Sequence, residues 1–221
     1  MTASASGRPT HLVWDWNGTL IDDLSLVISA TNAAFASVGG RDVDADEHRR
    51  LFRRPIADFY GHVLGRVVGA DEFAQLDKLF HDAYRQGLVN VALAADAEAA
   101  MRSWPGTQSL LSMWFHDELV PTIERYGLAD LFTRVDGRRQ PLGGAPDSKA
   151  HHLVAHLDVL GLTGDQVVLI GDSIDDADAA RAVGARCVLY SGGFTHPEQL
   201  RASGLPVADT LTDAVRLAAT T

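Results

Sequence analysis

The sequence contains little cysteine, no long apolar run and a deficit of positive charge. Cys187 is the only cysteine among 221 residues, so no internal disulfide framework can form and a reducing compartment is expected. No stretch approaches the roughly 18 apolar residues of a membrane-spanning helix, and the first ten residues lack the apolar segment of a secretory signal. These absences predict a soluble, cytoplasmic protein without a membrane partner.

The charge balance narrows the range of partners. Lysine and arginine number 19 against 29 aspartates and glutamates, which gives a formal net charge of −10. Nucleic-acid binding depends on clustered cations, so this balance argues against a nucleic-acid partner. A small phosphate ester is still compatible, because a bound divalent cation reverses the local charge. We therefore expect a small phosphorylated metabolite as the partner, and a monomer or a homodimer as the oligomeric state.

Short apolar runs that alternate with helix-like segments predict an α/β fold. The expected strands cover residues 11–14, 108–113, 131–135, 166–170 and 187–190. Continuous apolar runs such as residues 166–170 are typical of strands buried on both faces of a parallel sheet. Strands that alternate with helices indicate a doubly wound parallel sheet with a Rossmann-like core.

Residues 22–90 have a different pattern. Apolar residues recur there at spacings of three and four, and no convincing strand interrupts them. Gly69, Pro55 and the Gly39-Gly40 pair mark breaks between the helical segments. We predict a small, all-helical domain over residues 22–90, inserted after the first strand into an α/β core made of residues 1–21 and 91–221.

Acidic residues follow two of the predicted strands. Asp15 comes directly after residues 11–14, and Asp172 comes after residues 166–170 and a glycine. Ligands of open α/β sheets bind beyond the carboxyl ends of the strands, so both side chains are expected at one edge. Taken singly, each aspartate also fits a turn or a helix N-cap. Together they favour a Mg²⁺ site, because neighbouring carboxylates repel each other unless a cation or a proton lies between them.

Four motifs in order resemble the haloacid dehalogenase superfamily, and in particular its phosphoglycolate-phosphatase-like members. The first motif is Asp15-Trp16-Asn17-Gly18-Thr19-Leu20, the second is Ser112 at a strand end, the third is Lys149 on a helix, and the fourth is Gly171-Asp172-Ser173-Ile174-Asp175-Asp176. The predicted helical insertion lies between the first two motifs, where that family carries its first cap domain.

The resemblance implies a Mg²⁺-dependent phosphatase that acts on a small phosphomonoester. Asp15 would be the nucleophile and would form an aspartyl-phosphate intermediate. The ion would be held by Asp15, the main-chain carbonyl of Asn17 and Asp172. Asp176 would hold Lys149 or a metal-bound water, and Asp175 is the neighbouring alternative for that role.

The resemblance also implies how the phosphoryl group is bound. Lys149 and the Ser112 hydroxyl would contact its oxygens, as a positive charge and a hydrogen-bond donor. Backbone N–H groups at Gly18 and Thr19 would add further donors.

Asn17 departs from the family pattern, because the phosphatase members carry a second aspartate there as general acid and base. An amide cannot exchange a proton with the leaving oxygen, and this assistance is commonly worth about 10²–10⁴-fold in rate. Two alternatives to an efficient phosphatase follow: a phosphotransferase or mutase, and a weakly catalytic relative that binds a phosphorylated ligand. His116 is a candidate substitute acid, although it also fits an exposed histidine at a helix start.

The predicted helical domain contains an arginine cluster at residues 49–54. Arginine has a planar, forked donor that suits carboxylate or phosphate. Arg53 and Arg54 are therefore predicted to contact an anionic part of the substrate. The alternative for the cluster is a solvated helix face paired with nearby acidic residues, and it is favoured for Arg49 and Arg50.

Overall fold

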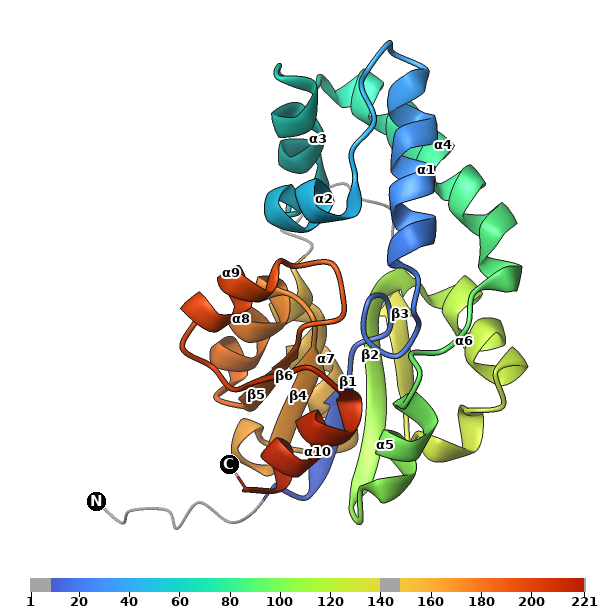
Figure 1. The fold of residues 1–221 in the computed structure, drawn as a ribbon. Coiled ribbons are helices and arrows are strands. Elements are labelled where there is room, and N and C mark those ends of the chain that lie inside the picture. Colours follow the sequence, from blue (N-terminus) through green and yellow to red (C-terminus); the bar gives the residue numbers. More distant parts are fainter. Residues whose placement is uncertain (1–8, 140–147, 221) are drawn as a thin grey trace.

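A computed structural model of the protein describes residues 9–139 and 148–220 (Figure 1). Six parallel strands form one sheet in the order β3-β2-β1-β4-β5-β6. The strands are β1 (His11–Trp14), β2 (Thr107–Phe115), β3 (Val135–Arg138), β4 (Val167–Gly171), β5 (Arg186–Tyr190) and β6 (Val207–Ala208). This architecture confirms the predicted doubly wound α/β fold.

Helices cover both faces of the sheet, which is why its central strands β1 and β4 are mainly apolar. Leu12 and Trp14 of β1 pack into one buried cluster, and Val13 packs into another on the opposite face. The first cluster includes residues of α5 (Ala97–Ser103), α6 (His116–Arg125) and α10 (Leu211–Thr220). The second includes residues of α7 (Lys149–Leu160), α8 (Ile174–Val183) and α9 (Pro197–Ala202).

Residues 24–90 contain only helices and their connections. They form α1 (Leu24–Ala36), α2 (Ala45–Leu51), α3 (Ile56–Leu64), α4 (Ala70–Gly87) and the 3₁₀ turn η1 (Leu88–Asn90). These helices have an apolar cluster of their own, which includes Phe35, Phe59 and Leu76. In Figure 1 they form a layer above the carboxyl ends of the strands, so they cover the edge where a ligand is expected. We call them the cap.

The register of the central strands fixes where the acidic residues leave the sheet. Trp14 lies opposite Leu110 of β2 and Ile170 of β4. The N–H of Asp15 donates to the carbonyl of Ile170 over 2.9 Å, so β1 and β4 end side by side. Asp15 and Asp172 therefore leave the sheet at the same edge.

The strand predicted at residues 131–135 is wrong in its position. A 3₁₀ turn η2 covers Ala129–Leu131, and β3 begins only at Val135. The strand contains Asp136, Gly137 and Arg138, so it lacks the apolar run from which the other strands were predicted. Gly137 lies so close to β2 that an added Cβ would approach the carbonyl oxygen of Trp114 to 2.7 Å. The short elements β6 and α9 were not predicted either.

Within residues 9–139 and 148–220, no helix combines the length and the apolar character needed to cross a membrane.

A chain of buried polar side chains runs between the sheet and α7. The two ring nitrogens of His11 lie 2.7 Å from Thr107 Oγ1 and 2.8 Å from Ser109 Oγ. His156 Nε2 lies 2.7 Å from the same Ser109 oxygen, and its Nδ1 lies 2.7 Å from Asp136 Oδ2. Burial, together with the neighbouring His156, lowers the pKa of His11 to about 4. His11 is therefore neutral in the folded protein at neutral pH.

This network predicts a pH dependence of stability. Unfolded histidine titrates near 6.5, so between pH 6.5 and about 4 the unfolded chain binds a proton that folded His11 does not. As the pH is lowered across this window, the free energy of unfolding should therefore decrease. His11 should account for up to about 3 kcal/mol of this decrease. Urea unfolding of the wild type and His11→Gln at pH 7 and pH 4.5 measures the difference. Equal losses in both proteins would contradict this role of His11.

Candidate active site

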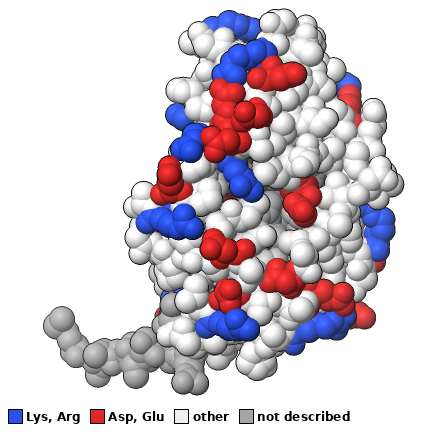
Figure 2. Space-filling view, in the orientation of Figure 1, with Lys and Arg blue, Asp and Glu red and all other residues white. Residues whose placement is uncertain are grey.

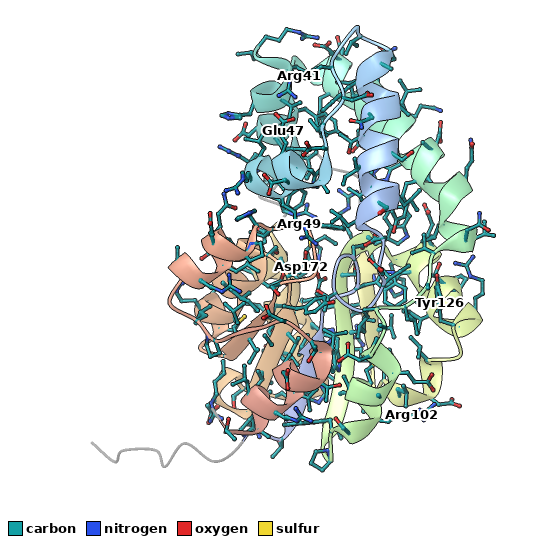
Figure 3. All side chains as sticks on the ribbon, viewed as in Figure 1. Arg41, Glu47, Arg49, Arg102, Tyr126 and Asp172 are labelled. Carbon is teal, nitrogen blue, oxygen red and sulfur yellow. The ribbon has the colours of Figure 1, made fainter. Side chains whose placement is uncertain are left out.

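Three neighbouring strands bring the predicted site residues together. Asp15 follows β1, Ser112 lies within β2, and Asp172 follows β4. Lys149 is the first residue of α7, whose N-cap Ser148 accepts a hydrogen bond from the N–H of His151. In Figure 3, Asp172 lies where the core meets the cap, with Arg49 on the cap side. The site is therefore assembled at the carboxyl edge of the sheet, beneath the cap.

A buried ion cluster forms the centre of the site. Lys149 Nζ lies 2.5 Å from Asp15 Oδ1 and also contacts Asp176 Oδ1. The side chain of Lys149 is 3% exposed and that of Asp176 is fully buried. Asp172 Oδ2 accepts a hydrogen bond of 2.6 Å from the N–H of Phe194, and its Oδ1 accepts one of 3.2 Å from the Thr19 hydroxyl. These contacts hold three carboxylates in fixed positions around one ammonium group.

The cluster has more negative charge than Lys149 alone can balance. Burial, opposed by the charge of Lys149, raises the pKa of Asp15 to about 6. Burial and then the charges of Asp15 and Asp176 raise the pKa of Asp172 well above its ordinary value. Burial alone would lower the pKa of Lys149, but its contacts with the two carboxylates outweigh this and raise it. A further cation would relieve the repulsion that remains.

The donor set fits Mg²⁺. Asp15, Asp172 and Asp176 each offer one carboxylate oxygen, and these three atoms lie within 4.8 Å of one another. Hard oxygen ligands are those that Mg²⁺ prefers. Asp176 belongs to this group, whereas Asp175 lies outside it and pairs with Arg54, with 3.0 Å from Asp175 Oδ2 to Arg54 Nε. The geometry thus separates the two neighbouring aspartates that the sequence left as alternatives.

Two glycines allow the loops to approach Asp172. Gly18 has a φ of +70°, and an added Cβ would lie 2.5 Å from Asp172 Oδ2. A Cβ at Gly193 would overlap the same carboxylate and the carbonyl oxygen of Gly18. The sequence placed Gly18 within a motif, but no local pattern around Gly193 indicated its role.

Asn17 is held by a network that the sequence did not predict. Its amide nitrogen donates to Asp23 Oδ2 and to the hydroxyl oxygen of Tyr84, both over 2.9 Å. The Tyr84 hydroxyl in turn donates to Asp23 Oδ2 over 2.7 Å. The Ser112 hydroxyl donates to Asn17 Oδ1 over 3.2 Å. The amide therefore connects the ion cluster's loop to the cap helix α4.

Asp23 is the residue that sequence reasoning missed most clearly. It precedes α1, where an aspartate normally caps the helix, but its side chain makes no capping hydrogen bond. Asp23 is fully buried, and its Oδ1 accepts a hydrogen bond of 2.7 Å from the N–H of Gly18. Burial raises the pKa of Asp23 to about 6, although the hydrogen bonds from Asn17 and Tyr84 act to lower it. The only signal in the sequence was the acidic pair Asp22-Asp23.

The predicted donors Gly18 and Thr19 have other partners in this structure. The N–H of Gly18 donates to Asp23, and the N–H of Thr19 donates to the carbonyl of Trp16 over 3.2 Å. The Thr19 hydroxyl contacts Asp172. Both residues thus shape the loop that holds the carboxylates, and their direct contact with substrate stays a prediction.

The members of the arginine cluster have different surroundings. Arg54 lines the cleft that contains Asp15, Lys149 and Asp172. Arg53 lies on an adjoining groove and donates to the carbonyl of Leu51 over 3.0 Å. Arg50 pairs with Asp46 and Glu198 at the surface. Figure 2 shows basic and acidic side chains interspersed over this face. Of the two predicted substrate contacts, the structure brings Arg54 to the cleft.

His116 does not line that cleft. Its Nδ1 accepts a hydrogen bond of 3.2 Å from the N–H of Gly137, at the start of α6. Burial, followed by the charge of Arg139, lowers its pKa. The structure therefore gives no support to His116 as the substitute acid.

The sequence is similar to those of known phosphatases. A family model described as HAD-hydrolase-like matches residues 145–214. The chain is 24% identical to phosphoglycolate phosphatase 1 of Pseudomonas aeruginosa, over 93% of this chain and 75% of that protein. It is 26% identical to the phosphoglycolate phosphatase of Rhodospirillum rubrum, over 91% of this chain and 87% of that protein.

Solved structures show the same fold. A predicted phosphatase from Clostridium acetobutylicum superposes with a TM-score of 0.82 at 15% identity, covering 96% of this chain and 98% of that chain. A haloacid dehalogenase-like hydrolase from Streptococcus pneumoniae gives a TM-score of 0.79 at 18% identity, covering 95% and 98%. These findings confirm the resemblance that the four motifs indicated.

The donor set predicts a metal-dependent gain in stability. Mg²⁺ binding to the folded chain should raise the melting temperature, by the equivalent of about 3 kcal/mol at a hundredfold excess over Kd. Asp172→Asn should lose this gain without lowering the metal-free stability, because it removes a ligand and a repulsive charge together. Differential scanning calorimetry with and without Mg²⁺ measures both effects. Asp178→Asn, in an exposed pair with Arg181, is the matched control. An undiminished Mg²⁺ effect in Asp172→Asn would rule out this site.

Proposed function

We propose that this chain, a phosphatase-like hydrolase of the haloacid dehalogenase superfamily, hydrolyses a small phosphomonoester with Mg²⁺ through an aspartyl-phosphate intermediate. The observation that carries the proposal is the contact of Lys149 with both Asp15 and Asp176, beside Asp172 and beneath the cap. A small phosphorylated metabolite in the cytoplasm is the substrate class that we propose.

Asp15 is the nucleophile in this proposal. One of its carboxylate oxygens attacks the phosphorus, the bond from phosphorus to the alcohol oxygen breaks, and the alcohol leaves with a proton from solvent. Water then attacks the phosphorus of the aspartyl-phosphate, which releases phosphate and restores Asp15. Lys149, held by Asp15 and Asp176, offers a fixed positive charge to the phosphoryl oxygens.

The remaining groups position the ester. The Ser112 hydroxyl is buried in β2 and reaches a phosphoryl oxygen by rotating away from Asn17. Asp15, the Asn17 carbonyl, Asp172 and Asp176 are the residues that would hold Mg²⁺, as direct ligands or through water. When bound, the ion would neutralise negative charge between the nucleophile and the phosphoryl group.

The amide of Asn17 favours a second candidate function. Because it provides no general base for water, the aspartyl-phosphate would persist and could pass its phosphoryl group to an alcohol acceptor. This phosphotransferase or mutase reaction uses the same nucleophile. When an alcohol acceptor is added, this reaction would form a phosphorylated product and would release correspondingly less free phosphate. A chain that binds phosphorylated ligands without turnover would give neither product.

The nucleophile assignment has a direct test. Asp15→Asn should lower phosphate release from a panel of sugar, nucleotide and carboxylate phosphates by at least about 10³-fold, because no covalent intermediate can form. Beryllofluoride, which mimics a phosphoryl group on aspartate, should bind to the wild type but not to the variant. Asp178→Asn, at the surface, should keep the wild-type rate. Turnover that survives Asp15→Asn with the fold intact would refute the assignment.

The Asn17 network predicts that two residues must be exchanged together. In Asn17→Asp alone, the new carboxylate faces Asp23 at the position of the present 2.9 Å hydrogen bond, so the two charges repel. In Asn17→Asp/Asp23→Asn, the amide and the carboxylate exchange places and the hydrogen bond is restored.

The double variant should therefore hydrolyse phosphate esters at least about tenfold faster than the wild type, because it gains a general acid and base. Asn17→Asp should gain less, and both single variants should be less stable than the double. Steady-state phosphate release and thermal melting of all four proteins form a double-mutant cycle. A double variant no faster than the wild type would show that the missing carboxyl does not limit the rate.

A further inference from the structure

A second cavity lies beside the cleft of the ion cluster, between the cap and the core. Its volume is about 120 Å³, against about 40 Å³ for the cleft itself. The two cavities share wall residues, among them Asn17, Met113 and Phe194. A phosphoester bound at Asp15 would therefore extend its alcohol portion into this second cavity, which we call the cap pocket.

Aromatic rings from both the cap and the core form the wall of the cap pocket. The ring centroids of Phe52 and Phe194 lie 5.5 Å apart, and those of Tyr84 and Trp114 lie 4.7 Å apart. Phe59 packs edge-on against Phe52 with 5.8 Å between centroids. A wall of this kind favours a flat or apolar group, because its contacts are mainly van der Waals and ring–ring interactions.

Some polar atoms of this wall have no hydrogen-bond partner among the described residues. Both ring nitrogens of His48 and the indole nitrogen of Trp114 are buried without a hydrogen bond to any described residue. His48 is fully buried and stacks on Phe52 with 5.4 Å between centroids and 18° between planes. Burial, and then the charge of Arg49, lowers the pKa of His48 to about 4, so its imidazole is neutral. A neutral imidazole presents one donor and one acceptor, and an unpartnered buried group of this kind is costly.

The two arginines in the wall already contact other side chains. The Arg54 guanidinium pairs with Asp175, and the Arg138 guanidinium lies over the Phe115 ring at 4.6 Å from its centroid. Asp77 contributes a carboxylate to the wall, and no lysine is among the described residues that line it. A second anionic group on the substrate would lose its hydration beside aromatic rings, with Asp77 nearby.

We propose that the cap pocket selects phosphomonoesters whose alcohol is a compact, uncharged and mainly apolar group, about the size of a six-membered ring, with one hydrogen-bonding function for His48 and Trp114. The size follows from the volume, because an engineered cavity of about 150 Å³ in another protein accommodates benzene. A two-carbon acid such as glycolate would leave most of the aromatic wall without contacts. The inference rests on the proposed function, since it concerns the alcohol of the same ester.

The test uses the full chain with Mg²⁺ and four esters: ethyl phosphate, 2-phosphoglycolate, benzyl phosphate and 3-hydroxybenzyl phosphate. The value of kcat/KM for benzyl phosphate should exceed those for ethyl phosphate and 2-phosphoglycolate by at least about tenfold, because the ring buries apolar area in the pocket. The added hydroxyl should raise the value further. A preference for 2-phosphoglycolate over benzyl phosphate would overturn the proposal.

Binding separates this inference from the proposed function. Calorimetry with Asp15→Asn compares the affinities for benzylphosphonate and phosphonoacetate. Neither compound has a phosphoester bond, so their binding is measured without turnover. Tighter binding of benzylphosphonate would support the cap pocket even if no ester is hydrolysed. A lack of hydrolysis would contradict only the proposed hydrolase activity. Equal or weaker binding of benzylphosphonate would overturn the cap pocket even in an active phosphatase.

His48→Phe isolates the polar contribution, because it keeps a flat ring of similar size and removes both nitrogens. The ratio of kcat/KM for 3-hydroxybenzyl phosphate to that for benzyl phosphate should fall toward one in this variant. His62→Phe, an exposed histidine of α3, is the matched control and should keep the wild-type ratio. An unchanged ratio in His48→Phe would overturn the assignment of His48.

Discussion

The structure depends on the burial of three carboxylates and one ammonium group at the edge of a parallel sheet. Lys149 contacts Asp15 and Asp176, yet the pKa of Asp15 and that of Asp172 are still raised. Such a cluster is stable only where backbone and hydroxyl donors take up the remaining oxygens. The N–H of Phe194 and the Thr19 hydroxyl do so for Asp172, which explains why two distant loops meet there.

Much of this arrangement could be predicted from the sequence, because it follows from strand order. Asp15 and Asp172 each come directly after an apolar strand, and parallel strands end at a common edge. The position of β3 could not be predicted from apolar character, because its side chains are polar and satisfied by contacts such as that of Asp136 with His156. Tyr84 and Phe194 act through a single hydroxyl and a single N–H, which leave no pattern in the sequence.

Asn17 shows how a departure from a motif can be compensated elsewhere. Asp23 accepts from the Asn17 amide, the Gly18 N–H and the Tyr84 hydroxyl, so its buried charge is fully hydrogen-bonded. The loop thus contains one carboxylate, Asp23, that is hydrogen-bonded to one amide, Asn17. The Asn17 amide nitrogen and the Asp23 carboxylate both contact the Tyr84 hydroxyl of α4, and the Asn17 amide oxygen accepts a hydrogen bond from the Ser112 hydroxyl. Position 17 therefore carries an amide while the nearby buried carboxylate of Asp23 accepts three hydrogen bonds.

The arginine cluster supplies contacts that join the cap to the core. Arg49 Nη2 donates to the carbonyl of Gly192 over 2.7 Å, and the Arg49 carbonyl accepts from the N–H of His196 over 3.0 Å. The ion pairs of Arg50 with Glu198 and of Arg54 with Asp175 are partly exposed, and exposed pairs contribute about 0–1 kcal/mol each. These two ion pairs therefore add little to the stability of the contact between cap and core. A ligand that fills the space between cap and core would add apolar contacts on both sides and would therefore stabilise the contact between them.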